Sequence, residues 1–199
     1  MPASTGPLGT AIALVEYRSI AAGIEAGDDM VKRAPLQIIH AGTVHPGKFL
    51  VLVGGEVADV EEAIVAAHAR DVGPLIDHMF LPDPEPRLVE ALSGAIAAAT
   101  GEALGIVETA SIADVIRAAD AGLKGADVAL RQIFIADDLG GRGYLLFSGT
   151  LSEVQAAVDL ATERVSGELI GTRVLPRIHA EMDANLEGDG RFASRLRGE

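Results

Sequence analysis

The sequence repeats itself, and this repeat limits the possible folds more than any other feature. Val15-Glu16 and Ser19-Ile20-Ala21 recur 92 residues later as Val107-Glu108 and Ser111-Ile112-Ala113. Beyond a central loop the offset becomes 94, so that Gly47 pairs with Gly141. A repeat of this length indicates two tandem copies of one domain.

Polar and proline-rich segments mark the ends of the two copies. Asp83-Pro84-Glu85-Pro86 reads as a linker-like turn, and Glu187-Gly188-Asp189-Gly190 opens a polar terminal segment. We therefore expect an N-terminal tail at 1–8, a first domain at 9–95, a second domain at 96–186 and a flexible C-terminal tail at 187–199.

Each copy predicts the same order of elements, β-α-β-β-α-β, which is the ferredoxin-like α+β arrangement. Serine caps are expected at Ser19 and Ser111, and a capping box at Thr150-Leu151-Ser152-Glu153. Each copy is also expected to end in a short C-terminal helix, which in the first copy is alanine-rich and covers 87–99. The expected strands cover 11–16, 36–41, 49–53, 104–108, 128–136 and 144–147, with final strands ending at Leu81-Pro82 and Leu175-Pro176.

Apolar residues recur at helical spacing in both copies. In the first helix of each copy, one face carries Ile20, Ile24, Gly27 and Val31, or Ile112, Ile116, Ala119 and Leu123. The second helices are predicted to bury a stripe made of Val57, Val60, Ile64 and Ala67, or Leu151, Val154, Val158 and Ala161.

Composition excludes several classes of function. The chain has no cysteine, which excludes disulfides, thiolate metal sites and cysteine nucleophiles. Its net charge of −13 disfavours a nucleic-acid partner. No apolar run approaches the roughly 20 residues that span a bilayer, and the first residues do not resemble a signal peptide. No membrane partner is therefore expected.

Two loops precede apolar strands at equivalent places, His45-Pro46-Gly47-Lys48 and Leu139-Gly140-Gly141-Arg142. The glycines could suggest a phosphate cradle, but such a cradle requires a following helix, and strands are predicted here. The five histidines include no pair at helical ligand spacing. Asp137-Asp138 is the acidic pair that lies at a loop. Neither loop is a convincing catalytic site.

The duplicated segments resemble the domain of bacterial microcompartment shell proteins (the BMC domain). The resemblance rests on Val15-Glu16 to Lys32, on Gly47-Lys48 to Ala63, and on their second copies. Leu175-Pro176-Arg177-Ile178-His179 is similar to the closing Pro-Arg-Pro-His of that domain, with Ile178 replacing the second proline.

This resemblance implies a tandem, unpermuted, trimer-forming shell protein with no enzyme activity and no cofactor. Three chains would form a pseudohexameric tile that packs beside other shell proteins. The tile would lie in the shell of a bacterial microcompartment in the cytoplasm, and small polar metabolites would pass its central pore.

The resemblance also implies roles for single residues. His45, Pro46, Gly47, Lys48, Leu139, Gly140, Gly141 and Arg142 would line or flank the pore. The tile edge would contain Lys32, Lys124 and Arg177. Asp83 is the residue of the first copy that corresponds to Arg177. Some tandem shell proteins hold an iron–sulfur cluster through a cysteine before Pro-Gly; His45 stands there, which excludes that cluster.

Two alternatives remain open at this point. Three copies of His45 could bind a metal or an anion at the threefold axis, since imidazole is a common metal ligand. The chain could instead be a soluble ferredoxin-like protein that binds a small molecule, because a fold alone does not fix a function.

Overall fold

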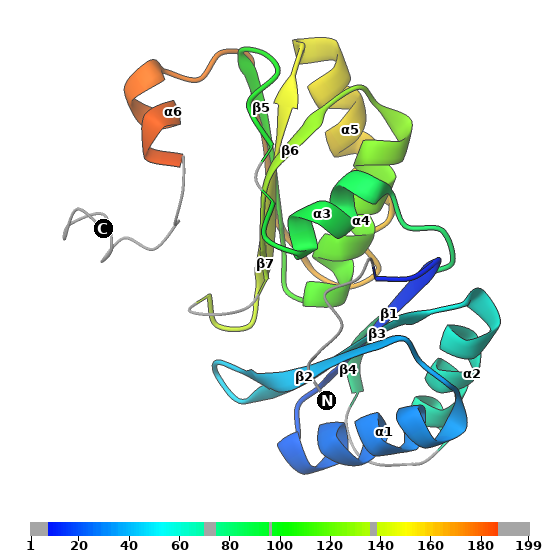
Figure 1. Cartoon of the computed structure of the whole chain (residues 1–199). Coiled ribbons are helices and arrows are strands. Elements are labelled where there is room, and N and C mark those ends of the chain that lie inside the picture. The colour runs from blue at the N-terminus through cyan, green and yellow to red at the C-terminus, as the bar shows by residue number, and fades with distance from the viewer. Residues whose placement is uncertain (1–7, 70–74, 96, 136–138, 187–199) are drawn as a thin grey trace.

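The computed structural model describes residues 8–69, 75–95, 97–135 and 139–186, which form two sheets with associated helices (Figure 1). The sheets have four antiparallel strands each and the equivalent strand orders β2-β3-β1-β4 and β6-β7-β5-β8. The predicted α+β class and the duplication are thereby confirmed. The 187–199 tail and Asp137-Asp138 lie outside the described residues.

The element order in each copy is the predicted β-α-β-β-α-β. The first copy contains β1 (Ala11–Tyr17), α1 (Ile20–Arg33), β2 (Ile38–Val44), β3 (Lys48–Gly55), α2 (Val57–His68) and β4 (Leu75–Leu81). The second contains β5 (Ala103–Thr109), α4 (Ile112–Gly125), β6 (Ala129–Ile135), β7 (Gly143–Gly149), α5 (Leu151–Glu163) and β8 (Leu169–Leu175). One short helix follows each copy: α3 (Pro86–Leu92) and α6 (Ala180–Leu186).

The predicted helix caps form, but the capping box is only half made. Ser19 accepts the Ala22 N–H at 3.3 Å and Ser111 accepts the Asp114 N–H at 3.1 Å. Thr150 accepts the Glu153 N–H at 3.4 Å, whereas the Glu153 carboxylate accepts the Asp127 N–H instead of returning to the cap. Each helix start is thus fixed by its own hydroxyl.

Two other sequence expectations were wrong in detail. The helix expected over 87–99 ends at Leu92, because Gly94 takes a positive φ of 94° that breaks the helical path. In the stripes of α2 and α5, Val57 and Leu151 are exposed in the first turn of each helix and Ile64 is only partly buried, whereas the other residues are buried.

Small residues let the helices approach the sheets closely. A Cβ placed on Gly122 of α4 would lie 2.4 Å from Cζ of Phe147, a fully buried ring of β7. Gly122→Val should therefore destabilise the chain by about 3 kcal/mol, the upper range for overpacking a core. Chemical denaturation followed by circular dichroism would measure the loss. Gly42→Val in exposed β2, where nothing lies within 4 Å, is the control and should be close to neutral.

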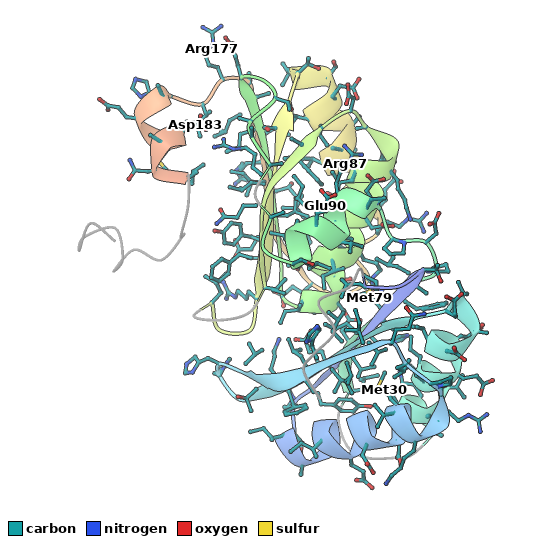
Figure 2. The ribbon with its side chains drawn as sticks, in the orientation of Figure 1. Met30, Met79, Arg87, Glu90, Arg177 and Asp183 are labelled. Carbon is teal, nitrogen blue, oxygen red and sulfur yellow. The ribbon has the colours of Figure 1, made fainter. Side chains whose placement is uncertain are left out.

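Helices pack on both faces of the first sheet, although most of its edge strand β2 is exposed. Its own helices α1 and α2 cover one face, where Met30 lies, and α4 of the second copy covers the other, where Met79 lies (Figure 2). Ile12, Leu14 and Met79 thus share one apolar cluster with Ile112 and Ile116. We call this contact the intrachain boundary.

The equivalent helices α1 and α4 differ in what covers their apolar faces. Ile112, Ile116 and Leu123 of α4 are 0%, 0% and 2% exposed in the intrachain boundary. Their equivalents Ile20, Ile24 and Val31 of α1 are 42%, 55% and 43% exposed. The same sequence pattern is therefore buried in one copy and open in the other.

The two short helices show the same difference. Leu88 of α3 is fully buried against the second copy, and Arg87 donates to the carbonyls of Leu123 and Val128 at 2.7 and 2.9 Å. The equivalent helix α6 buries none of its residues, and its Met182 is exposed. An ion pair between Asp183 and Arg131 connects α6 to β6.

Candidate functional site

The first loop is the turn between β2 and β3. The Gly47 N–H donates to the Val44 carbonyl at 2.8 Å, and Gly47 has a φ of 108°, a value that favours glycine. His45 and Pro46 are exposed at the tip of this turn. The loop therefore presents its histidine to solvent in the single chain.

The second loop, at Leu139–Arg142, has the equivalent position between β6 and β7. The Arg142 N–H donates to the Leu139 carbonyl at 3.3 Å, and Gly140 and Gly141 have φ angles of 64° and 77°. As predicted, each loop leads into a strand.

Lys48 connects the two loops. Its Nζ donates to Oε1 of Glu16 at 2.5 Å, to the Gly141 carbonyl at 2.7 Å and to the Ala110 carbonyl at 3.3 Å. The loops consequently lie side by side at one end of the intrachain boundary (Figure 1).

Glu16 is the buried centre of this group. Its side chain is 0% exposed, and its Oε2 accepts the Ile112 N–H, the first residue of α4, at 2.9 Å. Burial raises the pKa of the Glu16 carboxyl above its ordinary 4.5, an effect that outweighs the opposing influence of Lys48 and the helix N–H groups. A carboxylate sealed from solvent in this way holds two domains together and cannot meet a substrate.

A second polar group crosses the same boundary. The Ser111 hydroxyl donates to Asp77 at 2.5 Å, and Arg117 donates to both oxygens of Asp77 at 3.1 Å. Asp77 ends up linking β4 of the first copy to the start of α4 in the second.

The second copy has its own version of the Glu16–Lys48 pair. Glu108 and Arg142 are the equivalent residues, and their side chains lie 3.5 Å apart with 40% and 53% exposure. The pair is therefore formed loosely at the surface, whereas its counterpart is tight and buried.

The residues expected at the tile edge all form ion pairs. Lys32 pairs with Asp28, Lys124 pairs with Asp120 at 2.8 Å, and Arg177 pairs with Glu102 at 2.7 Å. Lys124 also donates to the Asp83 carbonyl. Lys32 and Arg177 are largely exposed. The role of Lys32, Lys124 and Arg177 at a tile edge stays a prediction.

The described residues contain no group of three histidine, aspartate or glutamate side chains that could hold a metal ion. Metal binding by His45 would thus need several chains and stays a prediction. The same residues include no helix with the length and apolar character that crossing a membrane requires.

Sequence reasoning missed Glu16, Glu108 and Asp77 as site residues. A signal was present for the first two, because an acidic side chain stands at the same place in two otherwise apolar strands. A buried charge of this kind requires a partner. Asp77 has no acidic equivalent, since Gly171 takes its place in the second copy.

Comparison with known proteins identifies the family. The sequence model of the BMC domain matches residues 11–84 and 103–178. The bacterial microcompartment shell protein PduT of Citrobacter freundii is 38% identical over 174 residues, which cover 86% of this chain and 95% of PduT. The chain belongs to the bacterial microcompartment shell protein family.

Other members of the shell protein family agree with this assignment. The carboxysome shell protein CsoS1C of Halothiobacillus neapolitanus is 38% identical over 93 residues, which cover 44% of this chain and 91% of that protein. A crystal structure of a microcompartment protein from Desulfitobacterium hafniense DCB has a TM-score of 0.75 at 36% identity, covering 87% of this chain and 98% of its own. The relatives named as shell proteins support a structural, non-enzymatic role.

Proposed function

We propose that this chain is a structural tile of a bacterial microcompartment shell, built as a homotrimer whose six domains surround a central pore. One observation carries the proposal. The α1 face with Ile20, Ile24 and Val31 is exposed, whereas the equivalent α4 face is buried on a neighbouring sheet. Burial of such side chains contributes roughly 1 kcal/mol each when half of their surface is already covered.

The surface that fits α1 lies on the second sheet. Figure 1 shows α4 and α5 beside one face of this sheet, with α6 near the other. On that other face Ile106 and Tyr144 are partly exposed, and Leu175 is 37% exposed. This face of the second sheet corresponds to the face of the first sheet that α4 covers.

The occupant is therefore a second copy of the chain. Contact between two different patches of one protein is heterologous, and such contacts close into rings when the rotation permits. A ring of six domains, which the family resemblance implies, closes with three chains. Copies of the intrachain boundary would then alternate with boundaries between chains.

The contact between the two loops supports the pore. Lys48 of the first loop already binds Gly141 of the second. If the equivalent contact formed at all six domain boundaries of the trimer, the six loops of the three chains would lie around one axis. With His45 and Pro46 exposed at a tip, the opening suits small polar metabolites. Lys32, Lys124 and Arg177 are proposed to contact neighbouring tiles of other shell proteins.

The trimer can be tested with engineered disulfides, because the chain has no cysteine of its own. Ser111 and Asp77 touch within the chain, and their equivalents across the proposed boundary are Ser19 and Gly171. Ser19→Cys with Gly171→Cys should give, on oxidation, a reducible ladder of up to three chains of 20.5 kDa each. An added side chain at Gly171 meets nothing within 4 Å.

The matched control is Ser111→Cys with Asp77→Cys, which should close within one chain and leave the mass of a single chain. Native mass spectrometry of the unmodified protein gives an independent count. The proposal would be contradicted if oxidised Ser19→Cys/Gly171→Cys protein and the unmodified protein in native mass spectrometry both remained single chains.

A further inference from the structure

The intrachain boundary contains a polar group whose second-copy equivalent is incomplete. At the intrachain boundary, Glu16 receives two partners from opposite sides, Lys48 of its own copy and the Ile112 N–H of the next domain. Glu108 has Arg142 of its own copy at 3.5 Å. In the described part of the chain, no further domain follows to supply the other side.

The repeat identifies what would fill that side. The residue equivalent to Ile112 is Ile20, at the N-terminus of α1, and Ser19 caps this helix as Ser111 caps α4. The carbonyls that Lys48 meets, Ala110 and Gly141, have Arg18 and Gly47 as equivalents. All of these groups belong to the first copy, so they can reach Glu108 only from another chain.

We propose that Glu108 and Arg142 form a clasp that a second copy of the chain completes. This inference rests on the proposed trimer. In the clasp, the Glu108 carboxylate accepts the Ile20 N–H of the second copy, where the positive end of the α1 dipole favours an anion. The Arg142 guanidinium donates to the Gly47 and Arg18 carbonyls of that copy, and its planar fork of donors suits two acceptors.

The clasp has a consequence for the pore. Lys48 is held at the boundary by three acceptors, and Arg142 becomes held in the same way. The cations beside the six loops therefore fasten domains together and do not project into the opening. His45 remains the exposed titratable side chain of the first loop.

Hydrogen exchange of the Ile20 amide in the full-length protein tests the clasp. Glu108→Ala should speed this exchange at least tenfold in the trimer, or dissociate a trimer that the unmodified protein forms. Glu108→Gln keeps an acceptor oxygen and should exchange more slowly than Glu108→Ala. The control is Glu102→Ala, which removes an exposed carboxylate just before β5 and should leave the amide and the trimer unchanged.

The outcomes separate the two proposals. If the Glu108→Ala variant stays trimeric and its Ile20 amide exchanges at the same rate as in the unmodified protein, the clasp is overturned and the trimer is not. An equal effect of Glu102→Ala also overturns it, because the response would then reflect charge alone. A protein that remains a single chain before any substitution overturns the trimer and the clasp together.

Discussion

Replacement of Ile24 by aspartate is expected to convert the proposed trimer into single chains and to leave each chain folded. Ile24 is the most exposed residue of the α1 stripe, at 55%, so a charge there costs the single chain little. In the trimer the same carboxylate would be buried against the second sheet without a partner. Each of three boundaries should lose about 2–4 kcal/mol, the range of interface hot spots. Native mass spectrometry measures the chain count.

The control for this experiment is Val65→Asp on α2. Val65 is also 55% exposed, and the equivalent residue of the second copy is already an aspartate, Asp159. This variant adds the same charge to a similar apolar position outside the stripe and should stay trimeric. Dissociation of both variants would indicate a general charge effect, and a trimeric Ile24→Asp protein would remove the stripe from the interface.

Substitution of Lys48 by methionine is expected to destabilise the chain by about 3 kcal/mol, because it leaves the Glu16 carboxylate buried without its cation. Glu16 is fully buried and the Lys48 side chain is 15% exposed, so water cannot replace the lost partner. Circular dichroism in increasing denaturant measures the change, since the chain has no tryptophan.

The double variant Glu16→Gln/Lys48→Met is the matched control. Glutamine keeps an acceptor for the Ile112 N–H and removes the buried charge, so the double variant should be more stable than Lys48→Met alone. A double variant as unstable as Lys48→Met would show that lost packing, and not the unpaired carboxylate, causes the effect.

The pH dependence of the Lys48→Met variant has a defined sign. Burial raises the pKa of Glu16 above its value of 4.5 in the unfolded chain. Between these two pKa values the folded chain holds more protons than the unfolded one, so the free energy of unfolding increases as the pH falls. Loss of Lys48 removes an influence that lowers this pKa, and the stabilisation on acidification should begin at a higher pH than in the unmodified chain.

Most of the fold could be predicted from the repeat and from local signals. Ser19, Ser111 and Thr150 cap helices because their hydroxyls act on N–H groups of the same turn, and such short-range interactions are visible in the sequence. The family assignment followed from motifs in register in both copies. The end of α3 was misplaced because alanines favour a helix beyond Gly94, whereas a backbone with positive φ ends it earlier.

The sequence could not indicate which apolar face is covered. Ile24 and Ile116 occupy the same place in the same pattern, yet one is open and one is buried. A periodic pattern shows which side of a helix is apolar, and only the three-dimensional arrangement shows what lies against it. For the same reason, Glu16 and Glu108 differ in burial although each follows a valine in equivalent strands.

In the proposed trimer, the polar group of Asp77, Ser111 and Arg117 would make the boundary within a chain different from the boundary between chains. The equivalents across chains are Gly171, Ser19 and Glu25, and a glycine has no side chain to accept what Asp77 accepts. The boundary within a chain is thus held by the connecting backbone and by ion pairs, whereas the proposed boundary between chains would depend more on apolar contact. Mild denaturation of the trimer should therefore release three folded two-domain chains. Each released chain keeps its intrachain boundary, which corresponds to the boundary that it must form again on reassembly.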